Sequence, residues 1–150
     1  MGFAGGMWLL WNPNKVTLEP TGQSFQELHS VIKLFKSKRN QLWNTLSEFA
    51  KRHSLPWLLI GDLNDYSKST ERFGGRPIPI SRLQNFNNFI NNCHFIDLGF
   101  TGPLFTWTNN HLDDTIIRGR IDRALSNQSW INKFPDSKVY HLPRSYYSDH

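Results

Sequence analysis

The residues best suited to chemistry begin with the tetrapeptide Gly61-Asp62-Leu63-Asn64, which follows an unbroken apolar run. A buried strand would deliver Asp62 and Asn64 to its carboxyl end, where ligands collect in open sheets. Residues i and i+2 leave a strand on the same side, so both side chains can reach one substrate. Asp62 could hold or activate an attacking water, and Asn64 could donate a hydrogen bond to a phosphate oxygen. Taken alone, however, such a tetrapeptide is more often an ordinary polar turn.

A second group of candidate residues lies later in the chain. Asp122 follows Ile121 in an extended segment, so the two side chains are expected on opposite sides. The terminal Ser148-Asp149-His150 includes a histidine, which can do acid–base or phosphate-binding work near neutral pH. Adjacent residues point apart on a strand, so we assign the orienting of His150 to Asp122 rather than to Asp149. Taken singly, a surface ion pair for Asp122 and a polar chain end for His150 are the favoured alternatives.

Basic residues near Asp122 complete the candidate set. We predict phosphate contacts for Arg118, Arg120 and Arg123 because they lie close to Asp122 in the sequence. The basic residues between positions 33 and 52 are predicted to form a solvated helix face. The order Ser–Asp–His is not a hydrolase triad, because the chain lacks the Gly-x-Ser-x-Gly turn that presents a nucleophilic serine.

Apolar patterning predicts the elements that hold these residues. The run Trp57–Ile60 predicts a central strand covered on both faces. Helices are predicted over about 38–53 and 127–134, and a third is predicted to be capped by Ser81 with an apolar stripe along 83–93. Further strands are predicted at 7–11, 16–19, 95–98, 104–108, 116–125 and 138–142. The segment 25–32 is compatible with either helix or strand, and the mixture favours a layered α/β or α+β sandwich.

Composition narrows the class of protein. Apolar residues make up 38% of the 150 residues, enough for a packed core, and the net charge of +5 suits an anionic partner such as nucleic acid without establishing one. The single cysteine, Cys93, excludes an internal disulfide and a Cys-rich metal site, and it favours a reducing, intracellular compartment. The opening apolar run Gly2–Trp11 is too short to span a bilayer, so no membrane association is expected.

The order of the motifs carries a resemblance. The chain resembles the endonuclease/exonuclease/phosphatase (DNase I-like) superfamily, most of all the endonuclease domain of plant non-LTR (LINE-type) retrotransposons. The matching motifs are, in chain order, Pro56–Asn64 (PWLLIGDLN), Ile96–Asn109 (IDLGFTGPLFTWTN), Arg120–Leu125 (RIDRAL), Trp130, Phe134-Pro135 and Ser148-Asp149-His150. Each motif is common by itself, whereas their order and spacing together are specific. The segment 5–11 and the helix around Leu42-Trp43 resemble the family as well.

The resemblance implies a four-layered α/β sandwich in which two packed β-sheets lie between outer helices, with the active site at one edge between the sheets. It implies hydrolysis of DNA phosphodiesters with a divalent metal, usually Mg²⁺. Carried over by position, Asp62 positions or activates the attacking water and Asn64 contacts the scissile phosphate. Asp122 orients His150, which contacts the phosphate and stabilises developing charge, and Asp149 matches an acid of the metal site.

The chain also departs from the family pattern. Two residues of the family, an early Asn and a Glu that binds the metal, have no counterpart in residues 1–150. The last core strand of the family has no counterpart here either. The segment Lys33–Lys38 is too short for a further strand with its Tyr-containing loop, which indicates an internal deletion. We therefore expect residues 1–150 to form one incomplete domain in which Asp149 is the only remaining metal-site acid. We expect this chain to cleave DNA very poorly.

Two other functions stay open at this point. One is an inactive remnant that binds nucleic acid weakly at most, and the other is a phosphatase of the same superfamily that acts on lipid or inositol phosphates. A retroelement nuclease would act in the nucleus. The sequence identifies no protein partner.

Overall fold

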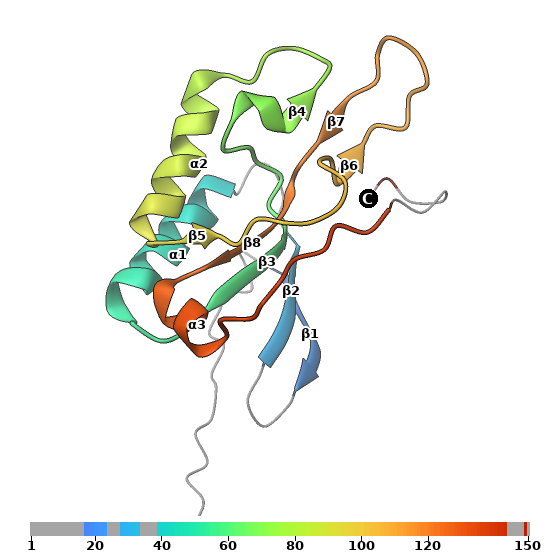
Figure 1. Ribbon diagram of the computed structural model, residues 1–150. Helices are drawn as coiled ribbons and strands as arrows, with labels where there is room; N and C mark the ends of the chain where they lie inside the picture. The colour runs from blue at the N-terminus through green and yellow to red at the C-terminus, as the bar shows by residue number, and fades with distance from the viewer. Residues whose placement is uncertain (1–16, 24–27, 34–38, 144–148, 150) are drawn as a thin grey trace, which may run out of the picture. The chain divides into compact units, whose positions relative to one another are not determined.

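The computed structural model describes residues 17–23, 28–33, 39–143 and 149 (Figure 1). The chain divides into two compact units, Met1–Arg39 and Asn40–His150. In the first unit, strands β1 (Thr17–Gln23) and β2 (Leu28–Lys33) pair antiparallel. The strand predicted at 16–19 is confirmed within β1, and the ambiguous segment 25–32 contributes β2. The strand predicted at 7–11 and most of the shortened segment 33–38 lie outside the described residues.

The second unit contains a three-stranded antiparallel sheet in the order β3-β8-β5. Its strands are β3 (Leu58–Asp62), β8 (Asp122–Ser126) and β5 (Ile96–Asp97). The strand predicted before Asp62 is therefore confirmed, and its predicted central position stays a prediction, because only the described strands can be ordered. Among the described strands β3 lies at the sheet edge and Ile60 is 66% exposed, whereas the central strand β8 buries Leu125 completely. An apolar run cannot distinguish these two positions, because the strand's neighbours come from elsewhere in the chain.

A second three-stranded sheet has the order β4-β7-β6. Its short strands are β4 (Arg72–Phe73), β7 (Arg118–Gly119) and β6 (Trp107–Thr108), and the 3₁₀ turn η2 (Ser69–Glu71) precedes β4. The segment 118–126 supplies both β7 and β8 and so joins the two sheets (Figure 1). Gly119 is required at this junction, because a Cβ there would come within 2.5 Å of the Tyr66 hydroxyl.

Helices α1 (Arg39–Arg52) and α2 (Ile80–Asn92) pack through aromatic side chains. Trp43 stacks on Phe89 with ring centroids 4.2 Å apart, and Phe86 beside them is fully buried. The predicted capping role of Ser81 is wrong, because α2 begins one residue earlier and the Pro79 carbonyl accepts the first amides, which places Ser81 inside the first turn.

The short helix α3 (Gln128–Lys133) is confirmed, and the Asn127 side chain caps it by accepting a hydrogen bond from the Trp130 amide. The strand predicted at 138–142 is wrong, since this segment makes only an isolated bridge between Tyr140 and Thr101. The described residues thus form a mixed α/β structure, as predicted. The four-layered sandwich with two packed sheets stays a prediction.

Candidate functional site

The carboxyl end of β3 brings two of the predicted site residues into contact. Asp62 is the last residue of the strand, and its Oδ1 and Oδ2 accept hydrogen bonds of 2.7 Å from the Asn64 amide nitrogen and Nδ2. Asn64 has φ 51°, a left-handed conformation that asparagine adopts more readily than most residues. The turn after the strand therefore folds the Asn64 side chain back onto the Asp62 carboxylate.

Asp122 lies beside this turn because of the sheet register. It is the first residue of β8 and pairs directly with Asp62. Residues directly opposite each other in an antiparallel pair project from the same face, with Cβ atoms about 4.5–5.5 Å apart. The backbone of Asp122 is held further by Thr106, whose Oγ1 accepts from the Asp122 amide at 3.1 Å and from the Ile121 amide at 3.2 Å. The structure thus brings Asp62, Asn64 and Asp122 together.

Asp149 lies against β6, the strand that follows Thr106. Its Oδ2 accepts a 3.1 Å hydrogen bond from Trp107 Nε1, and its carbonyl accepts a 3.0 Å hydrogen bond from the Thr108 amide. His150 lies outside the described residues, so its hydrogen bond with Asp122 stays a prediction. Asp149 is therefore connected to the Asp122 backbone through neighbouring residues of one segment, 106–108.

The carboxylates give a direct test of the metal that the resemblance implies. Magnesium requires near-octahedral oxygen ligands and is usually held by one or two carboxylates together with substrate phosphates. Within the described part of the chain, no group of three or more His, Cys, Asp or Glu residues could hold a metal ion. The described residues thus show no such group by themselves, and the predicted role of Asp149 as a ligand stays a prediction.

The three arginines predicted to contact phosphate differ in their surroundings. Arg118 is exposed on β7, whereas Arg120 and Arg123 are only 7% and 2% exposed. Each buried guanidinium bonds both Glu71 and Asp97, and we call these four residues the Arg–acid cluster. Its distances are 3.3 Å from Arg120 to Glu71, 2.8 Å from Arg120 to Asp97 and 2.9 Å from Arg123 to Asp97, and Arg123 also pairs with Glu71. This geometry favours a structural role for Arg120 and Arg123 over the predicted phosphate contact.

The Arg–acid cluster keeps its two carboxyl groups ionised. Burial by itself would raise the pKa of Glu71, but the hydrogen bond and charge of Arg123, with hydrogen bonds from Ser67, lower that pKa below its ordinary value. Burial alone would also raise the pKa of Asp97, but the hydrogen bonds and charge of Arg120 and the hydrogen bond from the Gly99 amide lower that pKa below its ordinary value. Two carboxylates and two guanidinium groups therefore form a neutral unit, which is buried except for Asp97, whose side chain is 29% exposed.

Arg82 is a residue near the site that the sequence analysis did not single out. From the first turn of α2, its Nη2 donates to the Asn64 carbonyl at 2.5 Å and its Nε donates to Asp65 Oδ1 at 2.7 Å. Asp65 is only 2% exposed, and the guanidinium also lies 5.2 Å from the centre of the Tyr66 ring. Arg82 thus holds the turn that carries Asn64. The sequence contains no signal for this contact, because Arg82 is separated from Asn64 by a polar loop.

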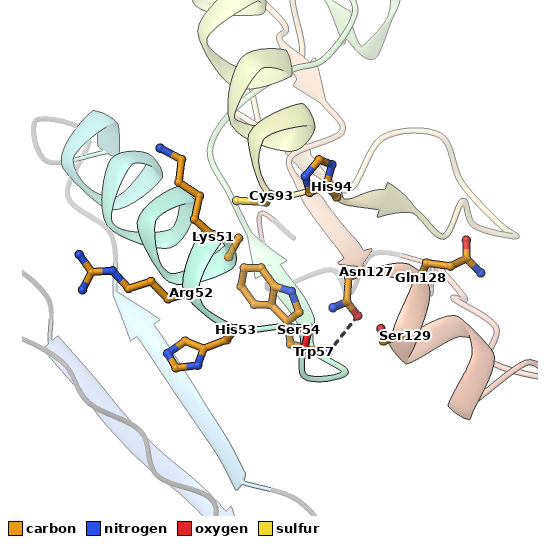
Figure 2. Close-up of a pocket in the computed structure, with 11 residues that line it drawn as sticks. Lys51, Arg52, His53, Ser54, Trp57, Cys93, His94, Asn127, Gln128 and Ser129 are labelled. Atoms are coloured by element: carbon orange, nitrogen blue, oxygen red, sulfur yellow. Dashed lines mark hydrogen bonds between the residues drawn. The ribbon is translucent and has the colours of Figure 1, made fainter.

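A hollow of about 450 Å³ lies at the opposite end of β3, beyond Trp57 (Figure 2). Its lining residues are Ala50, Lys51, Arg52, His53, Ser54, Trp57, Cys93, His94, Asn127, Gln128 and Ser129. Asn127 Oδ1 accepts a 3.2 Å hydrogen bond from the Trp57 amide at its rim. The hollow contains none of the predicted site residues, and the charge of Lys51 is paired with Glu48 at 2.7 Å. This hollow and the candidate chemistry therefore lie at different ends of the strand.

Comparison with known proteins gives one clear finding. The family model described as Endonuclease/Exonuclease/phosphatase family matches residues 4–150, a span that includes every predicted site residue. The search of curated proteins finds no match.

In the part of the chain that the structure describes, no helix has the length and apolar character needed to cross a membrane.

Proposed function

The chain belongs to the endonuclease/exonuclease/phosphatase family, and we propose that it hydrolyses phosphodiester bonds in DNA at the end of β3. The observation that carries this proposal is the direct pairing of Asp62 with Asp122, with Asn64 bonded to Asp62. Directly opposite residues of an antiparallel pair project from the same face of the sheet, so the side chains of Asp62 and Asp122 can reach one substrate. The net charge of +5 supports a polyanionic substrate.

Each residue of this group has a proposed part in the reaction. Asp62 accepts the proton of the attacking water, and its contact with Asn64 fixes the carboxylate for that task. Asn64 donates a hydrogen bond to a phosphate oxygen. Asp122 orients His150, and His150 stabilises the charge that develops on the phosphate.

The family typically uses a divalent metal, which would polarise the phosphate. Asp149 is the proposed carboxylate for Mg²⁺, and Trp107 Nε1 fixes that carboxylate in place. We assign the steps above to the chain's own groups alone. We propose that hydrolysis by these 150 residues is slow, because Asp149 is the one carboxylate assigned to hold the ion.

The proposal extends to the type of nuclease. The motifs of residues 56–64, 96–109 and 120–125 resemble the endonuclease domains of plant LINE-type retrotransposons, and we propose this origin together with a nuclear site of action. A reverse-transcriptase region in the same gene, downstream of the segment encoding these residues, is the expected observation. A gene that encodes an unrelated domain there would contradict the proposed origin.

The direct test is nicking of supercoiled plasmid with excess protein and Mg²⁺. We expect slow accumulation of nicked circles, abolished by Asp62→Ala and by His150→Ala. Asp136→Ala is the matched control, because Asp136 is an exposed aspartate outside the proposed site, and it should nick like the wild type. Nicking that survives Asp62→Ala would refute the proposed site.

The same proteins distinguish the two alternative functions. A phosphatase would release inorganic phosphate from an inositol phosphate faster than it nicks DNA. An inactive remnant would shift labelled DNA in a binding assay but nick nothing above the Asp62→Ala background. Our proposal expects Asp62-dependent nicking and no phosphate release.

A further inference from the structure

Two chain segments carry the candidate site, and they are tied together at more than one point. Asp62 and Asn64 lie in the segment 62–71, and Asp122 lies in the segment 118–126. The first tie is the sheet itself, through the pairing of Asp62 with Asp122 and the 2.9 Å hydrogen bond from the Leu63 amide to the Ile121 carbonyl. A second tie is made by a single residue, Glu71, at the other end of the first segment.

Glu71 bonds both segments at once. On its own segment, its carboxylate accepts hydrogen bonds from the Ser67 amide at 2.7 Å and from Ser67 Oγ at 2.9 Å. Across to the other segment, the same carboxylate pairs with Arg120 and Arg123, and the Glu71 carbonyl accepts the Arg120 amide at 2.8 Å. With 6% of its surface exposed, Glu71 makes these bonds in surroundings that strengthen electrostatic interactions.

The side chains of β8 place the Arg–acid cluster behind the site. Adjacent residues on a strand point to opposite faces, so Arg123 projects away from the face that carries Asp122. Its guanidinium lies 5.4 Å from the centre of the Phe86 ring on helix α2, which identifies the helix-covered face. The contact of Glu71 with Arg123 therefore lies on the face away from Asp122, so we expect Glu71 to act on Asp122 through the backbone of residues 120–123.

From this geometry we infer that Glu71 is a positioning residue that sets Asp122 against Asp62 and Asn64. The expected effect of Glu71 on catalysis rests on the proposed function. Its role in holding the two segments together rests only on its own contacts. Loss of the Glu71 charge frees the two segments to shift, and displacement of a reacting group by about 1 Å can cost roughly 100-fold in rate.

Asp97 supplies the matched comparison within the same cluster. It pairs with the same two arginines, at 2.8 Å and 2.9 Å, but it belongs to β5 and otherwise accepts the Gly99 amide. Asp97 thus neutralises the arginines without joining the two segments of the site. If the cluster serves stability alone, Glu71→Gln and Asp97→Asn should speed exchange at the site amides only in proportion to their losses of stability.

The experiment compares Glu71→Gln with Asp97→Asn in the full 150-residue chain by amide hydrogen exchange and single-turnover nicking. We expect both variants to lower the unfolding midpoint, and only Glu71→Gln to speed exchange at the amides of Leu63, Asn64 and Asp122. We also expect Glu71→Gln to slow nicking at saturating DNA by about tenfold to 100-fold with unchanged DNA affinity, and Asp97→Asn to slow it less. Equal effects of the two variants on these amides would overturn the inference.

Two further outcomes have their own controls: a variant that does not fold, and a wild type that does not nick DNA. If Glu71→Gln does not fold, Glu71→Asp takes its place, because it keeps the charge but shortens the reach to the arginines, and it should loosen the same three amides. If the wild type shows no nicking above Asp62→Ala, the proposed function fails. The exchange comparison then still decides whether Glu71 positions the two segments.

Discussion

Two pairs of carboxylates lie close together around β8, yet their surroundings are opposite. Glu71 and Asp97 are bonded to two buried arginines, so their charges are balanced within the protein. Asp62 and Asp122 instead occupy directly opposite positions in the β3–β8 ladder, at the carboxyl end of β3. The difference teaches that carboxylates beside one strand can serve different ends: the first pair neutralises buried arginines, and for the second pair we propose a chemical role.

The largest expected effect on stability is at Arg123, whose side chain is completely buried between the carboxylates of the first pair. Arg123→Met should lower the free energy of unfolding by about 3–5 kcal/mol, because it leaves the carboxylates of Glu71 and Asp97 to share the single guanidinium of Arg120. Urea denaturation measures this loss. Arg118→Met, which removes an exposed arginine from the neighbouring strand, should change stability by less than about 0.5 kcal/mol. Similar losses for the two variants would mean that the Arg–acid cluster does not stabilise the fold.

The next effect is a dependence of stability on acid pH. The folded-state pKa values of Glu71 and Asp97 are below their ordinary values of 4.5 and 3.8, mainly because their arginine partners outweigh the effect of burial. A carboxyl group whose pKa is lowered by folding stabilises the protein above its ordinary pKa, and this stability is lost as the pH falls through the folded value. We therefore expect the free energy of unfolding to decline progressively as the pH is lowered below about 4.5.

A pair of variants tests whether Glu71 and Asp97 cause this decline in the free energy of unfolding. Asp97→Asn removes one of the two titrating groups, so denaturation curves between neutral and acid pH should show a shallower decline. Glu48→Gln is the control, because the pKa of Glu48 is also lowered, by Lys51, but its side chain is exposed and the ion pair lies on the surface. An identical decline in wild type and Asp97→Asn would contradict the assignment.

The smallest effect concerns DNA binding at the two ends of β3. Arg118 is the exposed member of the predicted phosphate contacts, so Arg118→Ala should weaken DNA binding several-fold and reduce the slope of log affinity against log salt by about one. Arg52→Ala removes the same charge at the hollow beyond Trp57 and should leave the slope unchanged. Fluorescence anisotropy over a range of salt concentrations measures both. A larger effect of Arg52→Ala would move the DNA-binding surface to the other end of the strand.

Local periodicity explains which parts could be predicted from the sequence. The strand ending at Asp62 and the helices α1 and α3 follow from apolar spacing and polar caps within one short segment. The placement of Asp62 and Asn64 at one end of the strand follows in the same way, whereas their mutual hydrogen bonds depend on the left-handed turn at Asn64. The pairing of Asp62 with Asp122 was not predicted, because sheet register joins distant parts of the chain.

The Arg–acid cluster could not be predicted for the same physical reason. Arginine is mostly exposed in proteins, and only the arrival of carboxylates from distant segments makes its burial possible. The acids that bond Arg123 are Glu71 and Asp97, and neither is marked by spacing or motif as its partner. The sequence therefore indicated that the arginines near Asp122 matter, but it assigned two of them to the substrate rather than to the core.

The central claim is that the face shared by Asp62 and Asp122 performs phosphodiester hydrolysis. It is tested most directly by the single-turnover nicking rate of Asp122→Asn. The exposed control Asp136→Asn is measured beside it, and the two variants are required to have the same unfolding midpoint. Our account predicts that Asp122→Asn slows nicking by about 100-fold or more, because His150 loses the carboxylate that orients it to stabilise charge on the phosphate, while Asp136→Asn matches the wild type. Equal nicking by Asp122→Asn and the wild type would contradict the account.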